Sequence, residues 1–94
     1  MPDNAEAWFH LGDDAMEHKE YSNAISHYNQ GLNRSSKDPK ALNNLGTAYL
    51  FTGNLQEALK YYDAALRAYP EYNLASRNRA FVQHLLAANP PASK

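Results

Sequence analysis

The chain has 94 residues, of which 44% are hydrophobic and 20% are charged, and its formal net charge is −1. This length accommodates one small core, and the composition is ordinary for a globular domain. A net charge so close to zero argues against a general nucleic-acid binder, because such proteins usually carry a strong basic excess. The absence of cysteine excludes disulfides, thiolate metal sites and a cysteine nucleophile, and it leaves the redox compartment open.

The sequence also lacks the features of a membrane protein. No apolar run approaches the roughly 18 residues that a membrane-spanning helix needs, and the first residues lack the basic and apolar segments of a signal peptide. We therefore expect a soluble chain with no membrane or nucleic-acid partner. The compartment stays open, with a slight preference for the cytoplasm.

The first two predicted helices form an amphipathic pair. The first begins after Asp3 or Asn4, and Glu6 stands three residues after Asp3, as in a capping box. The second begins at about Ser22. Apolar residues recur at helical spacing in both helices; they are Trp8, Leu11, Ala15, Tyr21, Ala24, Ile25, Tyr28 and Leu32.

Two further helices follow in the same order. The third begins at Asp38 and Pro39, because a proline in the first helical turn has no hydrogen bond to lose. It ends at Gly53. Asn54 with Glu57 predicts a second capping pair for the fourth helix, which ends before Pro70. Its apolar stripe comprises Leu55, Ala58, Leu59, Tyr62, Leu66 and Tyr69.

A fifth helix is predicted from about Asn73 to the prolines at positions 90 and 91, and residues 90–94 are expected to form a disordered tail. Its apolar stripe comprises Leu74, Phe81, Val82, Leu85 and Leu86. Terminal repeats need a polar outer face to be soluble. The residues predicted to supply it are Arg77, Arg79, Gln83 and Asn89.

The helix pairs are related by an internal repeat of 34 residues. A shift by this period places Trp8, Leu11, Gly12, Ala24, Ile25, Tyr28 and Leu32 on Leu42, Leu45, Gly46, Ala58, Leu59, Tyr62 and Leu66. Helical hairpins repeated at this period stack on their neighbours, because one hairpin cannot bury its apolar face alone. The second copy resembles the tetratricopeptide repeat family at Leu42, Leu45, Gly46, Tyr49, Gly53, Ala58, Tyr62, Ala65 and Pro70.

This resemblance implies an all-α fold, a right-handed superhelix of antiparallel helical hairpins. We expect one domain over residues 1–89, with repeat one at 5–38, repeat two at 39–72 and a capping helix at 73–89. The first copy departs from the family pattern at Ala15, Lys19 and Ser36. Lys19 replaces the turn glycine, at a cost on the order of 1 kcal/mol in a left-handed turn. Pro2 matches the closing proline of a preceding repeat, so the chain is expected to be the C-terminal part of a longer array.

The resemblance also implies a concave groove lined by the first helix of each pair. Carried over position by position, the predicted peptide-binding residues are Phe9, His10, Asp13, Met16, Lys40, Asn43, Asn44, Thr47, Phe51, Arg77, Asn78 and Phe81. Apolar residues outside the core favour a binding surface. The alternative is that Leu50, Phe51 and Phe81 pack between neighbouring helices.

Two comparisons within the family refine this prediction. Asn44 and Asn78 share one repeat position and resemble the asparagine ladder of the O-linked N-acetylglucosamine transferases, which His10 interrupts in the first repeat. Their amides could pair with a peptide backbone, or they could simply be solvated. The carboxylate clamp of the chaperone-tail binders is matched at one of five positions, which here carry Phe9, Asp13, Asn44, Leu74 and Asn78. Capture of an acidic tail is therefore not expected, although a register using Lys40 and Arg77 stays open.

No catalytic or cofactor site is predicted. The sequence has no nucleophile elbow, glycine-rich phosphate loop or pair of carboxylates set across a cleft. His10, Asp14 and His18 recur every four residues on one helix face, which suits metal ligands but equally suits a water-facing stripe, and we predict no metal site. The expected function is a protein-interaction module that binds a peptide or helix. The alternative is a structural module that self-associates as a homodimer or packs in an array.

Overall fold

The structure is a computed structural model that describes residues 4–88. This range contains five helices and no strand: α1 (Ala5–Glu17), α2 (Tyr21–Arg34), α3 (Pro39–Phe51), α4 (Leu55–Ala68) and α5 (Asn73–Ala88). The all-α prediction is confirmed. No helix between residues 4 and 88 is long and apolar enough to cross a membrane. The predictions for the Asp3 cap, position 89 and the 90–94 tail fall outside the described residues.

Three helix starts lie where the sequence predicts them, and two of them have the predicted side-chain cap. Asn4 Oδ1 accepts the backbone N–H of Ala7 at 2.8 Å, and Asp38 Oδ1 accepts that of Ala41 at 3.0 Å. Both side chains therefore satisfy free N–H groups at a helix end. Asn54 is the N-cap residue of α4 as predicted, but its side chain makes no capping hydrogen bond and its amide donates to Thr52 Oγ1 at 2.8 Å instead.

In each hairpin, a tyrosine ring of the second helix packs directly against a glycine of the first helix. A Cβ atom on Gly46 would stand 2.8 Å from ring carbons of Tyr62, and one on Gly12 would stand 2.5 Å from Tyr28. Both tyrosines are almost completely buried. The two glycines thus let the paired helices approach closely enough to bury an aromatic ring between them, 34 residues apart in the sequence.

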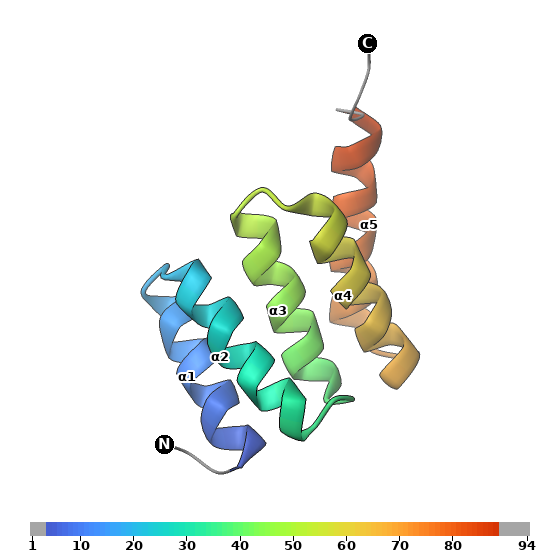
Figure 1. The fold of residues 1–94 in the computed structure, drawn as a ribbon. Helices are drawn as coiled ribbons and strands as arrows, with labels where there is room; N and C mark the ends of the chain where they lie inside the picture. The colour runs from blue at the N-terminus through green and yellow to red at the C-terminus, as the bar shows by residue number, and fades with distance from the viewer. Residues whose placement is uncertain (1–3, 89–94) are drawn as a thin grey trace.

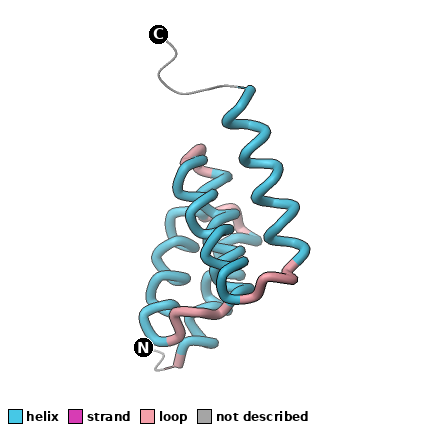
Figure 2. Tube along the Cα trace, turned by 90° about the vertical axis from the view of Figure 1, so that its right-hand side faces the viewer, coloured by secondary structure: helices cyan, strands magenta, loops and turns pink. Residues whose placement is uncertain are grey.

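The helices are arranged in two layers. α1 pairs with α2 and α3 pairs with α4, while α3 stacks on α2 and α5 stacks on α4 (Figure 1, Figure 2). α3 also contacts both α1 and α5, whereas the backbones of α2 and α4 do not come close to each other. Helices of the same layer therefore approach each other only among α1, α3 and α5, and the stack curves toward this inner layer. The superhelix of helical hairpins expected from the sequence is therefore present.

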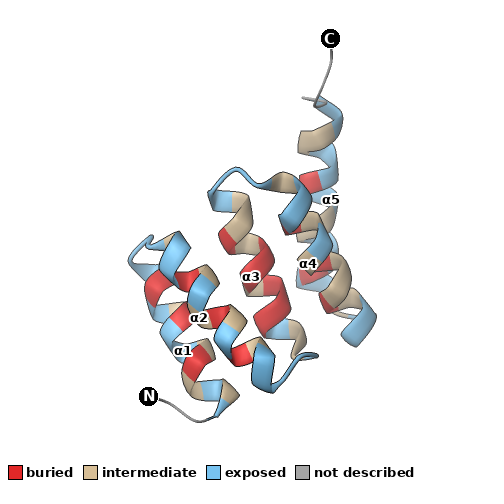
Figure 3. Cartoon of the chain, viewed as in Figure 1, coloured by how far each residue is buried: buried red, intermediate tan, exposed pale blue. Residues whose placement is uncertain are grey.

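The core is centred on α3, which is buried along much of its length (Figure 3). Its residues Ala41, Leu42, Leu45 and Ala48 are shielded by the neighbouring helices. The equivalent face of α1 is less covered. Leu45 is fully buried, but Leu11, one repeat earlier, is 40% exposed because no helix within residues 4–88 packs on that side.

An ion pair joins α5, the helix predicted to cap the array, to α4. The sequence prediction placed Arg79 on the polar outer face of the cap. Instead, Arg79 Nε donates to Asp63 Oδ1 of α4, and both side chains are about 40% exposed. Arg79 occupies the position of the buried Leu45 one repeat earlier, so a guanidinium–carboxylate pair takes the place of an apolar contact between hairpins.

The turns that connect the two helices of each hairpin allow the cost of backbone strain to be measured by mutation. Lys19 has a φ of 61° and Gly53 a φ of 84°, so the predicted left-handed lysine is confirmed. Because side chains other than glycine are strained there, we expect Lys19→Gly to raise the free energy of unfolding by up to about 1 kcal/mol and Gly53→Ala to lower it by about 1 kcal/mol. A Cβ at Gly53 meets nothing within 4 Å, so the second change isolates the backbone effect. Urea titration followed by circular dichroism measures both, and shifts of the same sign would contradict this account.

Candidate inner-face binding site

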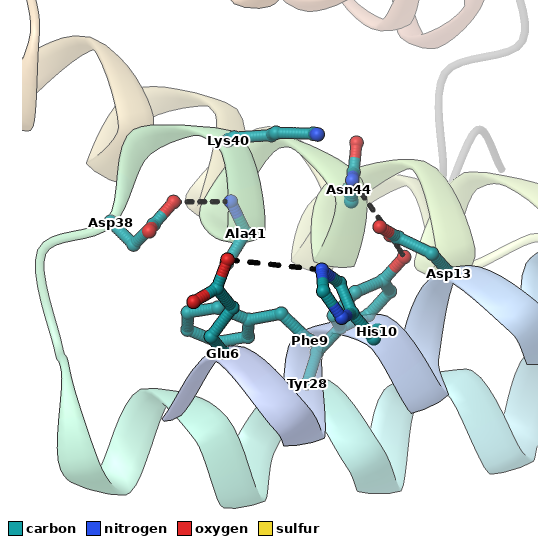
Figure 4. Close-up of a pocket in the computed structure, with 9 residues that line it drawn as sticks. All are labelled: Glu6, Phe9, His10, Asp13, Tyr28, Asp38, Lys40, Ala41 and Asn44. Atoms are coloured by element: carbon teal, nitrogen blue, oxygen red, sulfur yellow. Dashed lines mark hydrogen bonds and ion pairs between the residues drawn. The ribbon is translucent and has the colours of Figure 1, made fainter. Parts of the chain in front are cut away.

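A hollow of about 110 Å³ lies between α1 and α3 on the inner layer (Figure 4). Five predicted groove residues line it: Phe9, His10, Asp13, Lys40 and Asn44. The prediction did not include Tyr28, Asp38 and Ala41, which also line it, because one belongs to an outer helix and the others to a helix start. Three carboxylates, those of Glu6, Asp13 and Asp38, surround the hollow together with one lysine.

Asp13 joins three helices. Its Oδ1 accepts the hydroxyl of Tyr28 from α2 at 2.5 Å and the amide of Asn44 from α3 at 3.1 Å. Burial raises the pKa of Tyr28, and the hydrogen bond to Asp13 and its charge raise it further. The tyrosine therefore remains a hydrogen-bond donor at neutral pH. In the second hairpin Thr47, at the position equivalent to Asp13, pairs with the Tyr62 hydroxyl at 2.8 Å.

The asparagines connect the inner helices. Asn78 of α5 donates to Asn43 Oδ1 at 3.0 Å, much as Asn44 donates to α1. Asn43 is only 2% exposed, so it lies below the inner surface on which the sequence prediction placed it. Asn44 and Asn78 are half-buried, and one N–H of each is used within the protein. Their orientation is therefore set before any ligand arrives.

The predicted apolar lining is divided between core and surface. Phe9 packs against Gly31, and Met16 packs on the core of the first hairpin, so both are only partly accessible. Leu50 likewise packs on the buried Tyr62. Phe51 is 57% exposed, with its ring 5.1 Å from that of Tyr21 on the outer helix.

On α5, Leu74 is 43% exposed and Phe81 is 52% exposed. Leu74, Asn78 and Phe81 share one helix face because they are four and three residues apart. The bond from Asn78 to Asn43 turns this face toward α3. Leu74 and Phe81 therefore border the inner layer as exposed apolar side chains, with Arg77 also exposed on this helix.

A second hollow, of about 390 Å³, was not predicted from the sequence. It lies on the side of α3 and α4 that carries Leu42, Ala64 and Arg67, and it also borders Lys37. Its residues come from three separate segments. No single sequence pattern joins these segments, so only the folded chain brings them together.

The histidines of α1 take part in local pairs. His10 Nε2 lies 3.9 Å from Glu6, and His18 Nδ1 lies 2.9 Å from the backbone oxygen of Asp14. The Asp14 carbonyl and carboxylate raise the pKa of His18, which favours the protonated ring over a metal-binding one. Within residues 4–88, no three His, Cys, Asp or Glu side chains are grouped in a way that could hold a metal ion.

Comparisons with known proteins agree with this architecture. The family model of the tetratricopeptide repeat matches residues 39–72. Tetratricopeptide repeat protein 21B of Homo sapiens is 33% identical over 93% of this chain, and Hsp70-Hsp90 organizing protein 2 of Arabidopsis thaliana is 27% identical over 80% of it. The chain spans 8% and 13% of the length of these two relatives.

A solved structure resembles the fold closely. The tetratricopeptide repeat domain of Sgt2 from Aspergillus fumigatus has a TM-score of 0.85 and 28% sequence identity, over 89% of this chain and 56% of that one. The repeat of 34 residues, the paired helices closed by glycine and tyrosine, and these similarities have one explanation. The chain belongs to the tetratricopeptide repeat family.

Proposed function

We propose that the inner face formed by α1, α3 and α5 binds a peptide or helix of a partner protein, without catalysis by this chain. Its family and relatives are those of protein-interaction modules. The observation that carries the proposal is that one layer combines a polar hollow between α1 and α3 with exposed apolar residues on α5, Leu74 and Phe81. Such surfaces occur where apolar area is buried on binding and polar groups set the orientation.

The preformed hydrogen bonds support the same proposal. Asp13, Asn44 and Asn78 are held by neighbouring helices, so little side-chain freedom is lost when a ligand binds. The remaining N–H groups of the two asparagines can pair with a peptide backbone. The exposed groove residues Lys40 and Arg77 are available to polar groups of the same ligand.

A self-associating module is the second candidate. Leu11 is 40% exposed at a position that is fully buried in the second repeat, so α1 offers an uncovered edge. The same edge carries Asp14 where α3 has the buried Ala48, and a carboxylate is costly to bury without a partner. The cost of burying Asp14 therefore favours the inner face over the exposed edge of α1 as the main surface that contacts a partner.

The test compares two exposed aromatic residues. Phe81 on the inner face is 52% exposed, and Tyr69 at the end of α4 is 49% exposed. Phe81→Ser is expected to weaken capture of partner proteins from cell extract by about tenfold, since removing a central aromatic contact costs 1–2 kcal/mol or more, whereas Tyr69→Ser leaves capture unchanged. Equal capture by both variants would contradict the proposal.

A size in solution that rises with protein concentration, and that Leu11→Glu reduces to the size of one chain, would instead support self-association.

A further inference from the structure

We infer that the inner face selects an extended partner segment with a lysine or arginine, whose cationic group enters the hollow between α1 and α3, while apolar residues of the segment cover Leu74 and Phe81. This inference rests on the proposed function and specifies the chemistry of the partner. It is the reverse of what an acidic chaperone tail would need.

Charge is the first argument. The hollow has three carboxylates, Glu6, Asp13 and Asp38, and a single cation, Lys40 (Figure 4). A concave site with an excess of one charge attracts ligands of the opposite sign and repels those of the same sign. The sign of its charge is opposite to that of the hollow beside α3 and α4, which Lys37 and Arg67 border.

The hydrogen-bond geometry is the second argument. Asp13 uses only Oδ1 for Tyr28 and Asn44, and no hydrogen bond from residues 4–88 reaches its Oδ2. Asp38 likewise uses only Oδ1 for the backbone of Ala41. Both carboxylates are therefore fixed in place and still have an oxygen available for an ammonium or guanidinium donor.

The N-terminal ends of α1 and α3 at this hollow do not reverse its preference for a cation. The N-termini of α1 and α3 would by themselves favour an anion. Asn4 and Asp38 already accept N–H groups at these ends, at 2.8 and 3.0 Å. Less of the positive end of each helix is therefore available to an acidic ligand.

The apolar part of the surface sets the length of the segment. Packed helices lie about 8–10 Å apart, so the path from α1 over α3 to α5 spans roughly 20 Å. An extended chain covers this distance with about six residues. A basic residue at the α1 end would then be followed, about six positions away in either direction, by bulky apolar residues against Leu74 and Phe81.

The experiment selects displayed random 12-residue peptides on the immobilised chain. The test variant is Glu6→Gln/Asp13→Asn/Asp38→Asn, in which the amides can still accept the hydrogen bonds, and asparagine is as good an N-cap as aspartate. The matched control, Glu17→Gln/Glu57→Gln/Glu71→Gln, removes three exposed carboxylates elsewhere. Circular dichroism checks helix content. If the triple variant is less helical, Glu6→Gln alone replaces it, because that side chain is 81% exposed.

The expected result is that Lys or Arg is enriched in the selected peptides. The test variant should bind these peptides with an affinity lower on the order of tenfold, because each exposed ion pair contributes about two- to fivefold to affinity. The control variant should bind as the wild type does, and replacing the basic residue by norleucine should reproduce the loss. Affinity should also fall with added salt.

Three other outcomes would overturn the inference. Peptides that lose binding with Phe81→Ser but show no basic preference, or an acidic one, would contradict it while leaving the proposed function in place. Peptides insensitive to every inner-face substitution would contradict both. Failure to select any peptide would also count against both, because a preformed surface of this size should capture short segments.

Discussion

Replacing Tyr62 by alanine is expected to remove a large part of the stability of the chain. The ring is completely buried between Gly46 and the core formed by Ala58 and Val82. Truncating a buried aromatic side chain to alanine costs about 3–5 kcal/mol, which is a large part of the total stability of a small domain. Thermal or urea unfolding followed by circular dichroism measures the loss.

Two tyrosine variants separate the contribution of the ring from that of its hydroxyl. Tyr62→Phe keeps the ring and loses only the bond to Thr47, so its cost should be near 1 kcal/mol. Tyr69→Ala removes a ring that is 49% exposed and should cost less than about 1 kcal/mol. If Tyr62→Ala were no more harmful than Tyr69→Ala, the buried glycine–tyrosine contact would not be what closes the hairpin.

Replacing Asp13 by alanine is expected to lower the free energy of unfolding by about 1–3 kcal/mol, because the buried Tyr28 hydroxyl loses its acceptor. Asn44 loses its partner as well, but it is only half-buried and can turn to water. Asp13→Asn keeps an acceptor oxygen and should cost clearly less. Urea titration at neutral pH measures both variants.

A double-mutant cycle identifies the cause of this loss. If the unpaired hydroxyl is responsible, Asp13→Ala should cost much less in a Tyr28→Phe background, where no hydroxyl remains. An equal cost in both backgrounds would show that Asp13 acts through Asn44 or through helix contacts instead. The same cycle reports how firmly α1 is held to α2 at the inner face.

The fold was accessible to sequence reasoning because its signals are local. The recurrence of Ala24, Tyr28, Ala58 and Tyr62 at helical spacing predicted the buried faces, and these residues form the core. Asp38 before a proline predicted the start of α3, where its side chain indeed caps the helix. Asn54 occupies the predicted N-cap position of α4, but its side chain is turned to donate to the Thr52 hydroxyl and makes no capping bond.

The candidate site was only partly accessible. Position in the repeat placed Asp13, Lys40 and Asn44 on the inner layer, and the hollow includes all three. Position in the repeat did not reveal that Asn43 is buried or that Arg79 pairs with Asp63. Whether Asn44 and Asn78 contact a ligand remains a prediction.

The sequence by itself determined the helices, because periodicity and capping depend on residues a few positions apart, and its 34-residue repeat determined their pairing into hairpins. The layer to which each helix belongs followed from the resemblance to the tetratricopeptide repeat family. Only the tertiary structure decided which polar groups meet, such as Tyr28 with Asp13 and Asn78 with Asn43. These pairs join residues 15 and 35 positions apart. Their formation depends on the angle between packed helices and on the rotamers that neighbouring side chains leave free, and neither is encoded in the spacing along one helix.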